Sequence, residues 1–131
     1  MMYSCAPARQ GSSVVVRKKG KSLRIDLHCH YANPDVAAKL ADRNPGQYDP
    51  NVKFANALTR ETNVKQMKDR APKLSSIEVR LKDMDRMGID IQAVSPAPHQ
   101  TYYWTEPGMG AELARAQNER LAEIVAQHPD R

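Results

Sequence analysis

The sequence has few cysteines and no long apolar run. These two absences argue against a disulfide-stabilised protein and against a membrane-spanning one. Two cysteines, Cys5 and Cys29, do not make a disulfide framework, and their scarcity fits a reducing cytosol. No stretch approaches the roughly 18 consecutive apolar residues that a membrane span needs. With 40% hydrophobic and 27% charged residues among 131, the composition is that of one globular domain. We therefore expect a cytoplasmic protein without a membrane partner.

Acidic residues are absent from the first 25 positions. This stretch contains six basic side chains, whereas the rest of the chain has 14 basic and 15 acidic residues. The net charge of +5 therefore belongs to an N-terminal arm, and we expect no nucleic-acid partner. We interpret residues 1–22 as a basic arm, in which Val14–Val16 forms a hairpin with the strand that follows.

Beyond the arm, hydrophobic periodicity predicts a strand and a short helix before a long insertion. The strand runs from Leu23 to His30, and Asn33-Pro34 begins a helix that ends near Ala41. Residues 44–74 form a polar insertion with two helical pieces, of the kind that often serves as a lid or binding loop.

The segment after the insertion carries the clearest signals. Ser75-Ser76-Ile77-Glu78 predicts a capping box, and the helix that follows stops at Gly88. Residues 89–94 are typical of a strand and residues 111–127 of a second long helix. The order strand, helix, strand predicts parallel pairing. The expected fold class is therefore α/β, with residues 23–131 forming the first βα units.

The stretch "RIDLHCHYANP", residues 24–34, carries the candidate site. Successive side chains of a strand alternate between its two faces. The predicted polar face carries Asp26, His28 and His30, and the predicted apolar face carries Ile25, Leu27 and Cys29. Two imidazoles separated by one residue can converge on a single metal ion. The alternative is a solvated strand face that carries two histidines without binding anything.

Three stretches together resemble a known family. "RIDLHCHYANP" is similar to the His-x-His first strand of the metal-dependent amidohydrolases. "RLKDMDRMGIDIQAVSPAP" and "NERLAEIVAQHPDR" resemble the amidohydrolase-related family, which includes aminocarboxymuconate semialdehyde decarboxylase, aromatic-acid decarboxylases and hydrolases of unsaturated lactones. The likeness covers roughly residues 23–43 and 75–131.

This resemblance implies a (β/α)₈ barrel of the TIM type, incomplete in this chain because such a barrel needs at least about 200 residues. It also implies that His28 and His30 bind a divalent metal, most often Zn²⁺ and sometimes Mn²⁺. Further ligands and the catalytic acid–base groups are expected on strands beyond Arg131. Asp26, His99 and Trp104 are candidates for supporting groups or pocket walls.

The function implied by the resemblance is that of a metal-dependent hydrolase or non-oxidative decarboxylase. Its expected substrate is a small carboxylated or cyclic molecule, and the full-length form is expected to be a homo-oligomer. Arg60, Arg70 and Arg80 could bind a substrate carboxylate, although a solvated surface role is favoured for each.

Two alternatives to this function stay open. The chain could be an inactive remnant or a module that depends on a partner. It could instead be a phosphoesterase of the polymerase-and-histidinol-phosphatase type, whose first strand also reads Asp-x-His-x-His. Those enzymes usually continue with a Ser-Asp-Gly turn, which "YANPDVAAKL" lacks.

Overall fold

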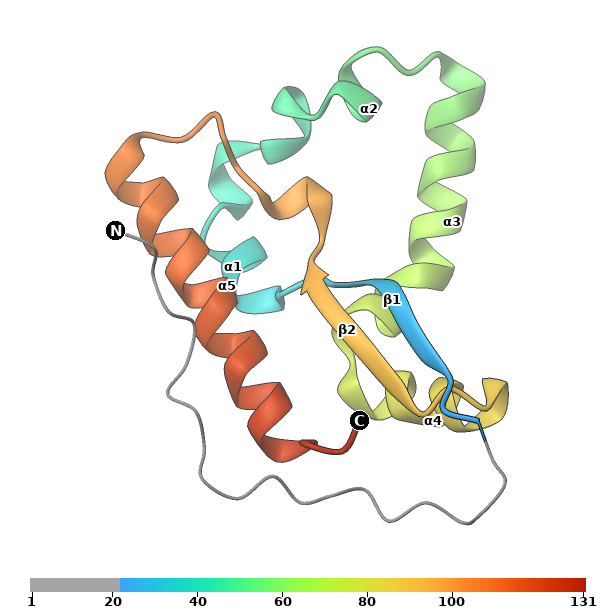
Figure 1. Cartoon of the computed structure of the whole chain (residues 1–131). Coiled ribbons are helices and arrows are strands. Elements are labelled where there is room, and N and C mark those ends of the chain that lie inside the picture. The colour runs from blue at the N-terminus through green and yellow to red at the C-terminus, as the bar shows by residue number, and fades with distance from the viewer. Residues whose placement is uncertain (1–21) are drawn as a thin grey trace.

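Two parallel strands form the centre of the structure, a computed structural model that describes residues 22–131 (Figure 1). Strand β1 (Ile25–Tyr31) pairs with β2 (Ile91–Pro96), and both run in the same direction. This confirms an α/β fold with parallel strands. No further strand occurs within 22–131. The hairpin expected to begin at Val14–Val16 lies outside the described residues.

Five α-helices accompany the two strands, joined in places by single 3₁₀ turns. They are α1 (Pro34–Ala38), α2 (Pro50–Lys53), α3 (Ala57–Ser75), α4 (Ile77–Met87) and α5 (Pro107–Gln127), with 3₁₀ turns at Ala41–Arg43, Pro45–Tyr48 and Pro98–Gln100. The predicted insertion therefore contains two helices, as expected, and the second is long. Helix α5 begins four residues earlier than predicted, because Pro107 fits the first helical position.

The ends of α4 are fixed by local chemistry. The Ser76 hydroxyl accepts a hydrogen bond from the Val79 amide (3.3 Å), and Gly88 closes the helix in the left-handed conformation at φ 70°. The helix stop at Gly88 is thus confirmed. The capping serine is Ser76, whereas the Ser75 hydroxyl donates to the Ala71 carbonyl at the end of α3.

Helices α4 and α5 cover one face of the two strands. Met84 of α4 and Ile124 of α5 are buried on this side, which we call the helix-covered face. A second core lies beyond the C-terminal ends of the strands, where α1 packs on α5. It contains Val36, Leu40, Tyr102 and Leu113. Because this core joins the segments that follow β1 and β2, it fixes the loops at that end of the sheet.

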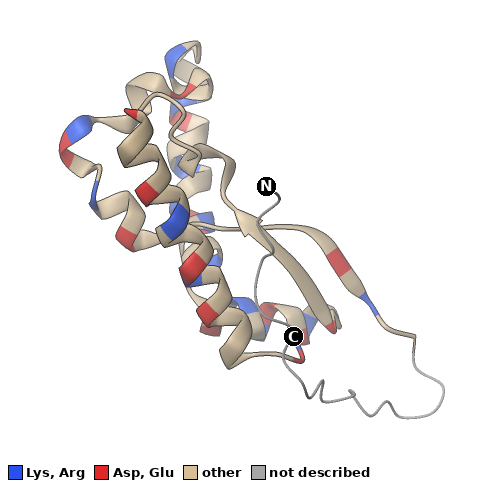
Figure 2. Cartoon of the chain, turned by 60° about the vertical axis from the view of Figure 1, so that its left-hand side comes forward, with Lys and Arg blue, Asp and Glu red and all other residues tan. Residues whose placement is uncertain are grey.

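The opposite face of the strands is uncovered in the described part of the chain. Ala93 and Ser95 of β2 are exposed there, and we call this side the open face. Helix α3 rises beside β1 and has no buried residue (Figure 1). Charged residues are distributed along the helices, whereas β2 contains none (Figure 2). None of the helices within residues 22–131 has the length and apolar character of a membrane span.

Candidate metal and substrate site

A bulge in β1 determines which side chains share a face. Asp26 pairs with Gln92 and Cys29 with Val94, so β1 has one more residue than β2 over this interval. The alternation predicted for residues 25–30 is therefore wrong across the bulge. Asp26 lies on the helix-covered face, because its partner Gln92 contacts Arg80 of α4.

The apolar residues before and within the bulge also depart from the prediction. Ile25 pairs with Ile91 on the open face, and Leu27 is 78% exposed instead of packing on the helices. Cys29 and Tyr31 follow the bulge and are buried on the helix-covered face. Burial raises the pKa of the Cys29 thiol, and the nearby Asp26 carboxylate adds to this effect while Arg80 opposes it.

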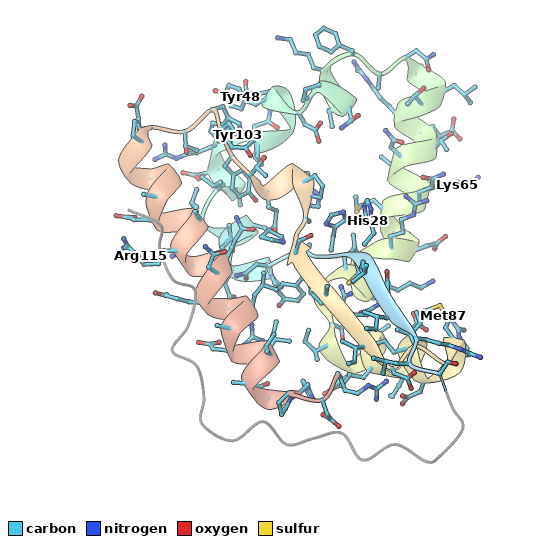
Figure 3. The ribbon with its side chains drawn as sticks, in the orientation of Figure 1. His28, Tyr48, Lys65, Met87, Tyr103 and Arg115 are labelled. Carbon is cyan, nitrogen blue, oxygen red and sulfur yellow. The ribbon has the colours of Figure 1, made fainter. Side chains whose placement is uncertain are left out.

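The structure brings the two candidate metal-binding side chains together. The ring centroids of His28 and His30 are 5.1 Å apart, with the rings nearly perpendicular. His30 pairs with Ser95 on the open face, where its Nδ1 lies 2.9 Å from the Ser95 hydroxyl. His28 lies near the lower end of α3 in Figure 3. The pairing of the two imidazoles, predicted from their spacing, is thus confirmed, although their role as metal ligands stays a prediction.

A chain of hydrogen bonds on the other face holds the bulge. The Asp26 carboxylate accepts from the His28 amide (3.1 Å) and from Gln92 Nε2 (2.9 Å). Gln92 Oε1 accepts from Arg80 Nη1 (3.1 Å), and Arg80 Nη2 donates to the His30 carbonyl. The backbone at both histidines is therefore tied to one polar network. Asp26 supports the site through the backbone, and Arg80 is a structural group that faces away from the open face.

The metal-binding chemistry of the described residues is incomplete. Neutral imidazole is a common ligand for zinc and similar ions, so the His28–His30 pair fits two positions of a coordination shell. No group of three or more His, Cys, Asp and Glu side chains within 22–131 is placed to hold an ion. Because a catalytic zinc normally has three protein ligands, the pair needs at least one more donor.

A glutamine that carries no motif connects the loops after the two strands. Gln100 is buried; its Oε1 accepts from the Asn33 amide (2.7 Å) and its Nε2 donates to the Asn33 carbonyl (2.9 Å). Gln117 of α5 donates to the Gln100 carbonyl (2.7 Å). Sequence reasoning missed this cluster. The signal available was a glutamine on the apolar stripe of α5, since a buried amide needs a partner.

An aromatic cleft of about 420 Å³ lies at the C-terminal end of the strands. One wall comes from the insertion and the other from the segment after β2, and the lining residues are Pro45, Tyr48, Asp49, Pro50, Pro98, His99, Thr101, Tyr102, Tyr103 and Trp104. Tyr48 stacks on Trp104 with 4.2 Å between ring centroids. Tyr48 and Tyr103 stand close together in Figure 3. Both Trp104 and His99, proposed from the sequence as pocket residues, therefore line a cleft.

His99 is the titratable group that relates the cleft to the histidine pair. Desolvation lowers the pKa of His99 below its usual value, and His30 lowers it further, whereas Asp49 raises it. Loss of water around the ring disfavours the imidazolium form. The neutral form of His99 can accept or donate a proton in the cleft near His30. Tyr102, buried beside it, has a raised pKa for the same reason of burial, partly offset by a hydrogen bond from Gln100.

Comparison with known proteins returns one enzyme name twice. No family model matches the sequence. The chain is 33% identical over 54 residues to 2-amino-3-carboxymuconate-6-semialdehyde decarboxylase of Dictyostelium discoideum, a match that covers 41% of this chain and 15% of that protein. It is 28% identical over 114 residues to the protein of the same name from Caenorhabditis elegans, which covers 85% of this chain and 28% of that protein.

The chain thus spans less than a third of the length of these curated relatives. The longer of the two matches is broad enough to take in most of the described residues. These matches confirm the resemblance predicted from the sequence, a likeness to the decarboxylase branch of the amidohydrolase-related family over part of its members' length.

Proposed function

We propose that this chain supplies one edge of the active site of a metal-dependent, non-oxidative decarboxylase. The observation that carries the proposal is the His28–His30 pair, with ring centroids 5.1 Å apart near the C-terminal end of β1. The similarity to two proteins named as decarboxylases supports this reaction over hydrolysis. Catalytic residues of parallel α/β barrels gather at this end of the strands.

The proposed architecture is the beginning of a (β/α)₈ barrel. In such a barrel, helices cover the outer face of the strands and side chains of the inner face line the core and site. In the described part of the chain, helices α4 and α5 cover one face of the two parallel strands, and the histidines project from the other. The open face would then be the inside of the barrel, with the missing ligands on strands outside residues 22–131.

His28 and His30 would hold a divalent metal, with Zn²⁺ as the first choice and Mn²⁺ as the second. When bound, such an ion supplies Lewis-acid polarisation of a substrate oxygen. The Asp26–Gln92–Arg80 network would hold the backbone at the two histidines, and the aromatic cleft would supply walls for the substrate. His99 would move a proton at its ring nitrogen, because its lowered pKa keeps it neutral near pH 7.

The cleft supports a small, flat substrate. Its walls are mostly aromatic rings and prolines, and among its lining residues only Asp49 carries a formal charge at neutral pH. A conjugated or cyclic body would stack there, since flat π-systems pack on aromatic rings at short distance. A substrate carboxylate would instead lie toward the histidine pair and its metal, because no lysine or arginine of residues 22–131 lines the cleft.

Metal binding by the chain tests the first part of the proposal. Equilibrium dialysis against buffered zinc should show weak binding that is lost in His28→Ala and in His30→Ala. The matched control is His128→Ala, because His128 lies beyond α5 and far from the pair in the chain. Binding that is unchanged by either substitution would refute the metal site. One zinc per chain at nanomolar free metal would show that the site needs no outside ligand.

The decarboxylation reaction is tested in the full-length protein. With 2-amino-3-carboxymuconate-6-semialdehyde as the probe substrate, we expect release of carbon dioxide and loss of activity in His28→Ala but not in His128→Ala. Turnover of an amide or lactone without carbon dioxide release would favour the hydrolase instead. No turnover of either kind would favour a partner-dependent or inactive chain.

A further inference from the structure

The Ser95 side chain lies between His30 and the backbone of β1. Its Oγ is 2.9 Å from His30 Nδ1 and 3.3 Å from the carbonyl oxygen of Cys29. Ser95 is the register partner of His30, so both contacts cross from β2 to β1 at the open face. No other part of the proposed site uses this hydroxyl.

Only one arrangement of protons makes both contacts of Ser95 hydrogen bonds at the same time. A hydroxyl has one proton to donate, whereas a carbonyl oxygen can only accept. In that arrangement Ser95 gives its proton to the Cys29 carbonyl, and its oxygen accepts from His30. The reverse arrangement, in which Ser95 donates to Nδ1, loses the hydrogen bond from the Ser95 hydroxyl to the Cys29 carbonyl.

We propose that Ser95 is a positioning residue that holds neutral His30 with its proton on Nδ1 and its lone pair on Nε2. The two ring nitrogens of a neutral imidazole divide these roles, and a hydrogen bond to one determines the state of the other. No hydrogen bond of the described residues engages His30 Nε2. Nε2 is then the nitrogen available to a divalent cation on the open face.

The backbone of His30 is held independently of Ser95. Arg80 donates to the His30 carbonyl from the helix-covered face, and it also bonds Gln92. Ser95 acts instead on the ring from the open face. A substitution at Ser95 therefore leaves the backbone anchor in place and changes the state of the ring, which separates positioning from folding.

The identity of the ion rests on the proposed function, whereas the tautomer of His30 does not. The tautomer is therefore measured first, in the absence of metal. Nitrogen-15 NMR of the whole chain, labelled at its four histidines, distinguishes a protonated from an unprotonated ring nitrogen. Spectra are recorded near pH 8.5, about two units above the reference pKa of imidazole. His30→Gln assigns the His30 signals. We expect the proton on Nδ1 in the wild type, and a shift of the population toward Nε2 in Ser95→Ala.

Two further variants control this measurement. Ser95→Thr keeps the hydroxyl on a residue suited to a strand and should retain the wild-type tautomer. Ser75→Ala removes a hydroxyl that likewise donates to a carbonyl, but from the end of α3, and should leave His30 unchanged. A wild-type spectrum with the proton on Nε2 overturns the inference by itself, even if Ser95→Ala does not fold. An unchanged tautomer in a folded Ser95→Ala chain also overturns it.

Metal affinity gives a second readout, with the same variants titrated with Zn²⁺ or Co²⁺. Loss of the group that orients a metal-binding histidine typically weakens binding about 10–100-fold. We expect this loss in Ser95→Ala, with near wild-type affinity in Ser95→Thr and Ser75→Ala. If the tautomer responds as stated and no variant binds metal, the inference stands and the proposed metal-dependent function fails. If the wild type binds metal and Ser95→Ala binds it with the same affinity, the role of Ser95 in presenting Nε2 is refuted.

Discussion

Among single residues, Gln100 shows how a buried amide can join two loops. Its side-chain amide accepts from the backbone N–H of Asn33 and donates to the Asn33 carbonyl. The backbone carbonyl of Gln100 accepts from the Gln117 side chain. All three residues are buried. A buried polar group without a partner costs more than a typical hydrogen bond contributes, so each member depends on the others. The cluster ties the start of α1 to the segment after β2.

Replacement of Gln100 by alanine should destabilise the chain by about 1–3 kcal/mol, because the buried Asn33 amide loses its partner and the Asn33 carbonyl keeps only the Ala37 amide. Gln47→Ala is the matched control, since the exposed Gln47 makes one hydrogen bond to the Arg43 carbonyl. It should change stability by no more than about 0.5 kcal/mol. Urea unfolding measures both. Equal effects of the two substitutions would show that the buried cluster is not structurally important.

The sequence predicted that His28 and His30 share a strand face, but it did not predict the face on which Asp26 lies. His28 lies within the bulged interval Asp26–Cys29 and His30 directly after it, and their rings still meet as simple alternation predicts. Asp26 is separated from them by the extra residue, which moves it to the other face. Bulges depend on how two strands pair, and neither strand carries a glycine or other mark of one. The Arg80–Gln92–Asp26 network likewise depends on which face each strand presents.

Helix ends could be predicted more accurately than strand ends. The α4 boundaries depend on local groups, namely the Ser76 hydroxyl and the left-handed Gly88. Strand β2 depends on its partner: pairing with β1 extends it to Pro96, two residues past the predicted end. Helix α3 is a helix that the sequence did not predict in full. Its segment has scattered apolar residues that indicated only loose helical pieces, yet it forms a helix of 19 residues. Its N-cap, Asn56, accepts from the Thr59 amide (2.8 Å).

Substitution of Gly88 by alanine should cost about 1–2 kcal/mol, because its φ of 70° is unfavourable for a residue with a Cβ. The added Cβ would also lie 2.6 Å from Arg24 Nη1, which can move because it ends a long side chain. Gly108→Ala is the control within α5, where an added Cβ meets no atom within 4 Å. That substitution should be neutral or stabilise the chain by about 0.4–1 kcal/mol. Thermal unfolding that ranks the two variants in the opposite order would contradict the assignment of the α4 cap.

The molecule as a whole has apolar surface on two neighbouring elements. Leu27 of β1 is 78% exposed, and Leu58 and Val64 of α3 are each 72% exposed. Strand β1 pairs on one edge only within residues 22–131. Large apolar patches on soluble proteins usually mark contact surfaces, and an open strand edge can pair with another chain. Within residues 22–131, the face of the sheet that carries the proposed site is therefore uncovered.

We therefore expect the purified chain to self-associate as its concentration rises, as measured by sedimentation velocity. Leu27→Lys and Val64→Lys should each shift the equilibrium toward the monomer, because a charged side chain at a contact loses hydration when the surface is covered. Tyr103→Lys is the charge-matched control: Tyr103 is 91% exposed but lies between β2 and α5, on the other side of Figure 3 from α3. It adds the same charge to a chain of net charge +5 and should leave association unchanged. A wild-type monomer at every concentration, with a cooperative unfolding transition, would mean that the open face is stable in water without a partner.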